Sequence, residues 1–291
     1  MNWRDGYIAV DWGTTNRRAF SIGGDGRVID RLADDRGLLA VGKDGFEAAA
    51  AEIIEKLGDR PMLLAGMVGS NRGWHEAPYV DCPASAPALA AAIHWIEPGR
   101  VGIVPGVCQR GVAGADVMRG EEVQAIGAVA AGLVSPNGML CHPGTHAKWL
   151  RMHGGGIAGF TTSMTGEMFS LLSRHSILAD QLQGAVAADE SFAAGVADAL
   201  AGKELLSALF GIRARWLLGE GKADASYASG LLIGSDVRAA LDTGTSEVAL
   251  IGTPELCALY AAALGIAGRE FVAIDGETAF LAGIRLLTEM L

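Results

Sequence analysis

The sequence has few cysteines and no long uninterrupted hydrophobic segment. Its four cysteines, at positions 82, 108, 141 and 257, are scattered and form no Cys-x-x-Cys pair. This spacing argues against a disulfide framework or a zinc site and favours free thiols in a reducing compartment. The apolar stretch 123–134 is too short and too glycine-rich to span a bilayer, and no apolar signal-peptide core follows Met1. We therefore expect a cytoplasmic protein that does not act at a membrane.

Basic side chains are also scarce. The chain has 23 Lys and Arg against 33 Asp and Glu, which gives a formal net charge of −10. Such a balance argues against nucleic acid as the main partner, because phosphate backbones attract basic surfaces. A small anionic substrate stays compatible with it, since that needs only a local basic cluster. The chain also has no Walker A motif, so a nucleotide would have to be bound in another way.

What the sequence does have is enough apolar material for two domains. Half of its 291 residues are hydrophobic, and predicted strands alternate with predicted helices, which is typical of α/β proteins. We place the domain boundary near 135/136, giving domains 1–135 and 136–291, and we allow for the last helix packing back on the first domain. Both halves open with β-hairpins, so we expect mixed sheets flanked by helices. The expected strands cover 7–11, 18–22, 27–32, 62–67, 101–104, 138–141, 147–152, 157–164, 248–252 and 270–274, and the main helices 44–57, 121–134, 167–177, 191–200, 203–218, 227–240, 254–264 and 278–290.

Two stretches of the chain share one outline. Residues 10–17 (VDWGTTNR) and 141–148 (CHPGTHAK) each consist of an apolar run, a Gly-Thr pair and a basic residue three positions after that Thr. Each continues into a further strand, a glycine turn and another strand. The repeat suggests two related half-molecules. The two turns suggest two backbone cradles for the phosphates of one nucleotide, formed by Gly13, Thr14 and Thr15 in the first half and by Gly144 and Thr145 in the second.

The two stretches differ at the position before each turn. The first carries Asp11 where the second carries His142. A carboxylate at a strand end beside a Gly-Thr turn can hold Mg²⁺ next to bound phosphates, although an aspartate there can also simply cap the turn. We favour the metal role for Asp11. In the second half Lys148 is then the group expected to stabilise charge on a moving phosphoryl group.

A pair of carboxylates, Glu121 and Glu122, stands at the start of the expected helix after Met118-Arg119-Gly120. Acidic residues in a first helical turn commonly serve only as partners of the helix dipole. The alternative is that one of them accepts the proton of an attacking hydroxyl, with Arg119 contacting an anionic substrate.

The loop 66–74 follows an expected strand and is rich in small and polar residues. It is either an ordinary connection or a sugar-binding loop, because small residues let a ligand approach the backbone. Its candidate substrate contacts are Gly69, Ser70, Asn71, Arg72 and Trp74.

These motifs carry a family resemblance. Residues 10–16, 142–146, 250–256 and 275–283 resemble the two phosphate motifs, the adenosine motif and the second connecting helix of the sugar kinase/Hsp70/actin superfamily. The resemblance implies two ribonuclease H-like (actin-like ATPase) domains with an interdomain cleft. Four strings together, 11–16, 65–71, 118–122 and 143–146, are more closely similar to the 2-dehydro-3-deoxygalactonokinases, and the match runs over essentially the whole chain.

The resemblance implies a reaction. It is the transfer of the γ-phosphoryl group of ATP to the 6-hydroxyl of 2-dehydro-3-deoxy-D-galactonate, which yields the 6-phosphate in galactonate breakdown. The implied cofactors are ATP and Mg²⁺, with Asp11 on the metal. Glu121 is the candidate base by its position ahead of the second phosphate motif. Adenine is expected near Gly252, Thr253 and Leu256. The candidates for binding the substrate carboxylate are Arg17, Arg72 and Arg119, with Glu122 as a further substrate contact.

Two other functions stay open at this point. One is an exopolyphosphatase-like phosphohydrolase of the same fold, which would use water in place of a sugar hydroxyl; the loop 69–74 argues against it. The other is a non-catalytic nucleotide sensor, which would need neither Asp11 nor the two glutamates. The sequence leaves open the substrate stereochemistry, the order of binding, the choice between the glutamates and the oligomeric state, a homodimer included.

Overall fold

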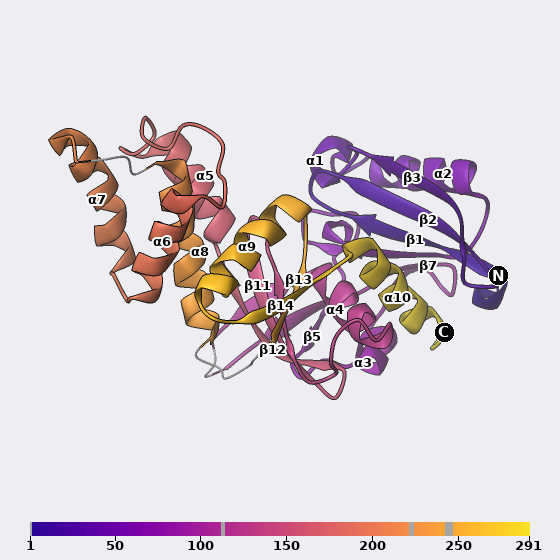
Figure 1. Cartoon of the computed structure of the whole chain (residues 1–291). Coiled ribbons are helices and arrows are strands. Elements are labelled where there is room, and N and C mark those ends of the chain that lie inside the picture. The colour runs from indigo at the N-terminus through magenta and orange to yellow at the C-terminus, as the bar shows by residue number, and fades with distance from the viewer. Residues whose placement is uncertain (1, 112–113, 221–223, 242–246) are drawn as a thin grey trace. The chain divides into compact units, whose positions relative to one another are not determined.

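The computed structural model describes residues 2–111, 114–220, 224–241 and 247–291. The chain divides into two compact units (Figure 1). Unit 1 comprises residues 1–137, 151–160 and 276–291, and unit 2 comprises 138–150 and 161–275. The first division, after residue 137, lies close to the predicted boundary. Residues 151–160 also group with unit 1, as does the C-terminal helix.

Unit 1 is built on a six-stranded mixed sheet in the order β3-β2-β1-β4-β7-β6. Strands β1, β2 and β3 form an antiparallel meander, and β1, β4 and β7 run parallel. The strands of this sheet are β1 (Gly6–Trp12), β2 (Arg17–Gly23), β3 (Val28–Asp34), β4 (Met62–Gly66), β6 (His94–Glu97) and β7 (Val101–Ile103).

Helices cover both faces of that sheet. Alternate residues of β1, among them Val10 and Trp12, pack against Phe46 and Ile53 of α2 in one hydrophobic core. On the opposite face α10 packs against α4, and the rings of Phe20 and Phe280 lie 6.3 Å apart. The helices of unit 1 are η1 (Trp3–Asp5), α1 (Leu38–Val41), α2 (Phe46–Leu57), η2 (Met67–Gly69), α3 (Ala86–Ala91), α4 (Glu121–Ala130) and α10 (Gly276–Thr288).

A second, three-stranded sheet of unit 1 was not predicted. Strand β8 (Gly106–Gln109) lies between β5 (Tyr79–Asp81), to which it is parallel, and β9 (Asp116–Met118), to which it is antiparallel. Strands of three or four residues leave too short a period-2 pattern for sequence to reveal. This sheet matters for the site because β9 leads directly into α4.

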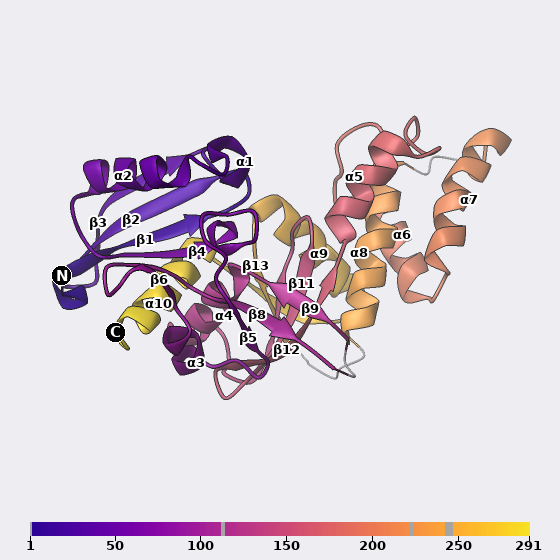
Figure 2. The same ribbon diagram turned by 180° about the vertical axis from the view of Figure 1, so that it is seen from behind.

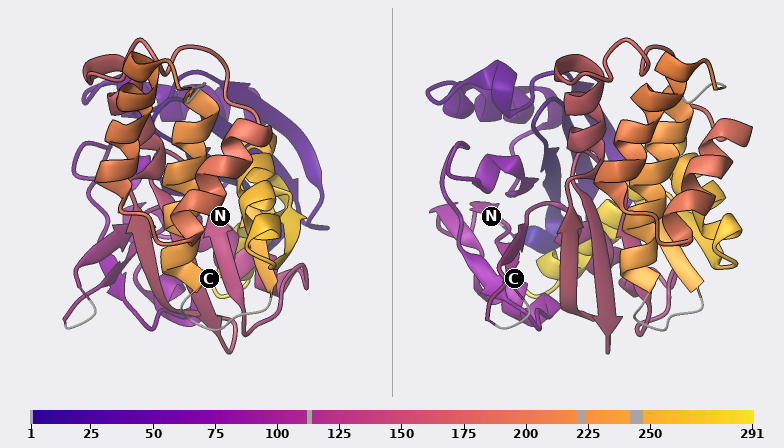
Figure 3. Two further views of the ribbon diagram at one scale, coloured as in Figure 1. Left: turned by 60° about the vertical axis from the view of Figure 1, so that its left-hand side comes forward. Right: turned by 90° about the vertical axis from the view of Figure 1, so that its left-hand side faces the viewer.

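A five-stranded mixed sheet has the order β12-β11-β10-β13-β14. It belongs to unit 2 except for residues 151–160 of β11, β12 and the turn between them, which group with unit 1. Its strands are β10 (Met139–His142), β11 (Ala147–His153), β12 (Gly156–Ser163), β13 (Glu247–Ile251) and β14 (Glu270–Ile274). The helices of unit 2 are α5 (Thr165–His175), α6 (Glu190–Leu200), α7 (Leu205–Leu218), α8 (Ala225–Leu241) and α9 (Pro254–Ile266). Figure 2 shows α5, α6, α7 and α8 as one helical group within this unit, which Figure 3 views from two further sides.

A buried carboxylate connects several elements of unit 2. Asp236 of α8 accepts hydrogen bonds from Trp149 Nε1 at 3.0 Å, Thr165 Oγ1 at 3.1 Å and the Tyr260 hydroxyl at 2.6 Å. These partners lie on β11, α5 and α9. Burial raises the pKa of Asp236 even though each of these hydrogen bonds lowers it.

The order β3-β2-β1-β4-β7 in unit 1 matches β12-β11-β10-β13-β14 in unit 2. The prediction of two related α/β units, each with a mixed sheet flanked by helices, is confirmed. Boundaries differ by a few residues: the helix predicted over 121–134 ends at Ala130, and the last helix spans Gly276–Thr288. Among the described residues, no helix is both long and apolar enough to cross a membrane.

Candidate active site

The first Gly-Thr turn is the four-residue connection between β1 and β2. The amide of Gly13 donates to the carbonyl of Asn16 at 2.9 Å, which closes the turn. Thr14, Thr15 and Asn16 are exposed. The turn is therefore a compact, solvent-facing hairpin end.

The start of α1 (Leu38–Val41) holds this turn from behind. Its first two amides donate to the carbonyls of Gly13 and Thr14 at 3.0 and 3.1 Å, and the Gly37 amide donates to Thr15 at 3.0 Å. A Cβ atom on Gly37 would lie 2.3 Å from the carbonyl carbon of Thr15, so only glycine permits this approach. The carbonyls are thus engaged, whereas the amides of Thr14 and Thr15 have no acceptor among the described residues. This arrangement can bind an anion.

The second Gly-Thr turn, residues 143–146, is braced in the same manner. The Glu167 amide in the first turn of α5 donates to the carbonyl of Thr145 at 2.9 Å. A Cβ atom on Gly166 would lie 2.6 Å from the Gly144 oxygen and 3.0 Å from Thr145 Cα. The internal repeat therefore extends beyond the hairpin to a helix start whose glycine touches the turn.

The predicted adenosine motif lies beside this second turn in unit 2. A Cβ atom on Gly252 would be 3.2 Å from the carbonyl oxygen of Pro143. Thr253 caps α9, because its hydroxyl accepts from the Leu256 amide at 3.5 Å. The side chain of Thr253 is thus engaged in starting the helix.

The basic residues after the two turns are not structural equivalents. Arg17 is the first residue of β2, whereas Lys148 is the second residue of β11. Ala147 and Trp149 belong to the hydrophobic core of unit 2, so the alternation of side chains directs Lys148 to the opposite face of its strand. The counterpart of the buried Lys148 in unit 1 is therefore Arg18.

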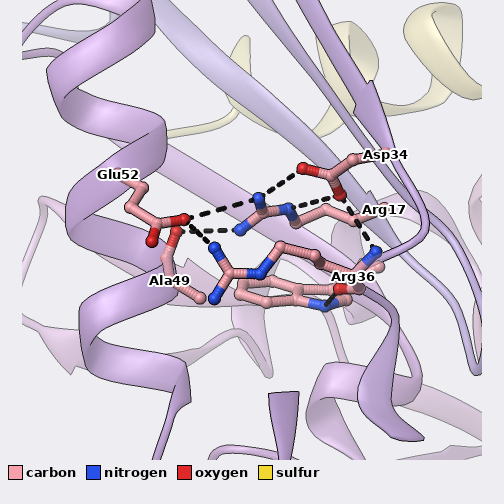
Figure 4. A network of polar contacts seen from close by, with 6 residues as sticks. Arg17, Asp34, Arg36, Ala49 and Glu52 are labelled. Carbon is pink, nitrogen blue, oxygen red and sulfur yellow. Dashed lines mark hydrogen bonds and ion pairs between the residues drawn. The ribbon is translucent and has the colours of Figure 1, made fainter. Parts of the chain in front are cut away.

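Arg17 makes structural contacts (Figure 4). It is 1% exposed, and its guanidinium donates to both carboxylate oxygens of Asp34 at 3.1 and 2.6 Å and to the carbonyl of Ala49 at 2.9 Å. Glu52 lies 3.8 Å away, and the Trp12 ring centroid is 5.2 Å from the Arg17 Cζ atom. Its position on the α2 face commits the Arg17 guanidinium to these partners, which does not favour the predicted role of Arg17 in binding the substrate carboxylate.

Asp11 lies at the meeting point of three elements of unit 1. In the register of β1 and β2 it stands opposite Arg18, and their side chains form an ion pair at 2.5 Å. A Cβ atom on Gly66, at the end of β4, would be 3.6 Å from Asp11 Oδ1, and a Cβ atom on Gly120, before α4, would be 3.3 Å from Gly66 Cα. No group of three metal-ligating side chains occurs among the described residues. A single carboxylate still suits Mg²⁺, which is usually bound through one or two carboxylates together with water and substrate phosphates.

Glu121 and Glu122 both fold back onto the backbone before α4. Glu121 Oε2 accepts from the Arg119 amide at 3.2 Å, and Glu122 Oε2 accepts from the Gly120 amide at 2.7 Å. Glu121 is half-buried, whereas Glu122 is fully buried and its Oε1 has no hydrogen-bond partner among the described residues. Burial, followed by the charge of Glu121, raises the pKa of Glu122 to about 8.

Arg119 is a buried cation with spare donors. It donates from Nη2 to the carbonyl of Ala77 at 2.8 Å, and its Cζ lies 4.4 Å from the centroid of the Tyr79 ring. Its Nε and Nη1 have no hydrogen-bond partner among the described residues. A Cβ atom on Gly69 would lie 2.9 Å from Nη1, so the absence of a side chain there makes room for the guanidinium. Such a site is suited to bind an anion.

The remaining residues of the loop 66–74 differ in how exposed they are. Ser70 is buried, and its hydroxyl accepts from the Arg72 amide at 3.3 Å. Asn71 and Arg72 are exposed. Trp74 packs against the hydrophobic core of unit 1.

Several residues of the site were missed from the sequence. Gly37 and Gly166 brace the turns, Arg18 pairs with Asp11, and Tyr79 stacks on Arg119. A signal was present for Arg18. In a hairpin closed by residues 13–16, Trp12 stands opposite Arg17, so Asp11 stands opposite Arg18. For the others the contact is between segments far apart in the chain, which no local pattern reveals.

Two sheets of the same order, each opening with a helix-braced Gly-Thr turn, define an actin-like ATPase fold of the sugar kinase type. The family model described as 2-keto-3-deoxy-galactonokinase matches residues 11–287, and the chain belongs to this family. It is 38% identical to the Rhizobium meliloti protein named probable 2-dehydro-3-deoxygalactonokinase DgoK1, over 96% of this chain and 95% of that protein. It is 35% identical to the Escherichia coli 2-dehydro-3-deoxygalactonokinase, over 96% of both. A Sinorhizobium meliloti crystal structure assigned as a 2-dehydro-3-deoxygalactonokinase superposes with a TM-score of 0.90 at 34% identity, covering 98% of both chains.

Proposed function

We propose that the protein transfers the γ-phosphoryl group of ATP to the 6-hydroxyl of 2-dehydro-3-deoxy-D-galactonate in galactonate catabolism. Membership of the family supports the reaction. The observation that carries the assignment to residues is the asymmetric pair of turns: both are braced by a helix start, but only the first has a carboxylate, Asp11, on the strand before it. We further propose a cytoplasmic location, which the free cysteines favour.

In unit 1 the proposed roles follow from the contacts. The amides of Thr14 and Thr15 bind phosphate oxygens. The carbonyl groups of the same two residues already accept hydrogen bonds from the start of α1, which fixes the turn with these amides unpaired within the described part of the chain. Asp11 would hold Mg²⁺, which would supply positive charge beside the phosphates. Arg18 orients the Asp11 carboxylate by the ion pair at 2.5 Å.

In unit 2 the turn at Gly144 and Thr145 binds phosphate oxygens through its backbone. Gly252 and Leu256 border the adenosine, next to the Pro143 end of the same turn. Lys148 supplies positive charge from the strand that follows. Charges already in place need little rearrangement in the transition state, which is how such sites lower the barrier to phosphoryl transfer.

We assign the base to Glu121 in preference to Glu122. A base must reach the substrate hydroxyl, and Glu121 is half-buried whereas Glu122 is fully enclosed. In the reaction the substrate oxygen forms a bond to the γ-phosphorus, the bond from that phosphorus to the β–γ bridging oxygen breaks, and Glu121 takes the hydroxyl proton. Glu122 instead holds the start of α4.

We assign the substrate carboxylate to Arg119. Its Nε and Nη1 have no hydrogen-bond partner in the part of the chain that the structure describes, and a guanidinium matches a carboxylate with two parallel hydrogen bonds. Both atoms are buried, so the carboxylate has to displace a neighbouring group to reach them. Arg72 is exposed and its backbone belongs to the Ser70 turn, so it is the weaker candidate. Gly69, Ser70 and Asn71 contribute to the same site.

A coupled assay for ADP release tests the proposal. The wild type should release ADP only when 2-dehydro-3-deoxy-D-galactonate is present, and Asp11→Asn should lose at least about a hundredfold in kcat with an unchanged melting temperature. Release of phosphate without the sugar acid would indicate a phosphohydrolase. Binding of ATP without any substrate-dependent ADP release would indicate a sensor, and either result would overturn the proposal.

A further inference from the structure

Helix α7 lies at the outer side of the helical group of unit 2, next to α6 and α8 (Figure 1 and Figure 2). One face of α7 is packed against the other helices of the group. Leu205, Leu209 and Ile212 pack with residues of α5, α6 and α8 in a common hydrophobic cluster. The opposite face is turned away from that cluster.

This outward face is apolar where a solvent-facing helix would carry charges. Leu206 is 82% exposed, Phe210 59% and Leu217 61%. The whole helix contains no acidic residue and no lysine. A helix that is hydrophobic on all sides is normally buried on all sides.

The outward face carries one row of large side chains and one row of small side chains. At 100° per residue, Leu206, Phe210 and Leu217 form one ridge along the helix, and Arg213 lies on the same row between Phe210 and Leu217. Beside the ridge runs a row of small residues, Ser207, Gly211 and Ala214, at spacings of four and three. Ridges of one helix pack into grooves of this kind on another.

Gly211 has no role in the packing of the chain itself. A Cβ atom placed on it would meet nothing within 4 Å among the described residues. A glycine inside a helix lowers helix stability relative to alanine, so its presence here is unexplained by the fold. Close approach of a second helix would explain it.

We propose that α7 is the contact surface of a homodimer, in which the Leu206–Phe210–Leu217 ridge of one copy packs into the Ser207–Gly211–Ala214 groove of the other. A two-fold axis requires a self-complementary patch, and this face carries both the ridge and the groove. The exposed parts of Leu206, Phe210, Leu217 and Leu218 amount to roughly 550 Å², about two thirds of the ~800 Å² that each partner contributes to a standard-size interface.

Charge favours a second copy over a lipid surface. Helices that lie on membranes are rich in Lys and Arg on their polar side. Helix α7 has only Arg213 and Arg215, and Arg213 is engaged with the carbonyl of Ile177 at 3.3 Å. The net charge of −10 further opposes binding to an anionic bilayer.

Sedimentation velocity over a roughly hundredfold range of concentration around the micromolar level tests the proposal. The wild type should sediment as a dimer. Phe210→Glu and Leu217→Glu should raise the dissociation constant at least about tenfold and leave the activity per subunit unchanged. Ile29→Glu is the matched control, because Ile29 lies on β3 and is 61% exposed, as is Leu217. It should leave the dimer intact.

Gly211→Leu separates the interface from the fold. It fills the groove, so it should also raise the dissociation constant at least about tenfold. At a concentration where both proteins are monomers, its melting temperature should equal or exceed that of the wild type, because leucine favours the helix and meets no clash. A wild type that stays monomeric throughout, or that floats with anionic vesicles as a monomer, would overturn the proposal. So would substitutions in α7 that leave the dimer intact.

Discussion

The enclosed carboxyl group of Glu122 should make the stability of the protein depend on pH in a way that a single substitution removes. Its pKa is raised from 4.5 to about 8, chiefly by burial. The folded protein therefore keeps a proton on Glu122 over a range of pH in which the unfolded chain has lost it. Each pKa unit corresponds to about 1.4 kcal/mol, so the total effect is about 5 kcal/mol.

The sign follows from the raised pKa. The favourable contribution of Glu122 is fully present below its unfolded pKa of 4.5 and is lost as the pH rises through about 8. Glu122→Gln resembles the protonated side chain at all pH values and keeps an oxygen for the Gly120 amide. Between about pH 5 and pH 9 the wild type should lose about 4 kcal/mol more unfolding free energy than the variant.

Urea denaturation of both proteins across this pH range measures the difference directly. Glu121→Gln is the comparison: it removes the charge that contributes after burial, so it should reduce the pH dependence only in part. In kinetic assays Glu121→Gln should have the larger effect. It should lower kcat at least about a hundredfold, whereas the kcat of Glu122→Gln should stay within about tenfold of the wild-type value. Parallel stability curves for wild type and Glu122→Gln would refute the reasoning about burial. A collapse of kcat in Glu122→Gln alone would transfer the role of base to that residue.

Three further substitutions test other parts of the site. Arg17→Met should cost about 3–5 kcal/mol of unfolding free energy in urea by leaving Asp34 without its partner, while the KM for the sugar acid stays the same. Gly37→Ala should raise the KM for ATP at least about tenfold in the coupled assay, since its Cβ atom would displace the first turn, and an unchanged KM would contradict the bracing role. Arg119→Met should raise the KM for the sugar acid about tenfold to a hundredfold, at about 1.5–3 kcal/mol for hydrogen bonds to a charged group, with the KM for ATP unaffected.

Much of the fold could be predicted because its signals are local. The hairpins around the two turns show the period of strands, and a repeated Gly-Thr pair marks where each hairpin ends. Helices α5 and α6 show the period of 3.6 over 11 residues each. The sheet β5-β8-β9 lacked such a signal, because three-residue strands are defined by their partners and not by their own pattern.

The site was predictable in its parts and less so in its geometry. The motif predicted a basic residue near the first turn, but successive side chains of a strand point to opposite faces of the sheet. A shift of one position therefore exchanges the buried Arg17 for Arg18 beside Asp11. The spare donors of Arg119 depend on the absence of a side chain at Gly69 and on the ring of Tyr79, both distant in sequence.

The carboxylate of Asp236 links the helical group of unit 2 to the second Gly-Thr turn. One of its partners, Thr165, is two residues before Glu167, whose amide fixes the second turn at Thr145. The backbone that we propose to bind phosphate is therefore connected to α5 and α8 through these hydrogen bonds. A substitution on the outer side of α6 or α7 can therefore change what this surface contacts without moving that backbone.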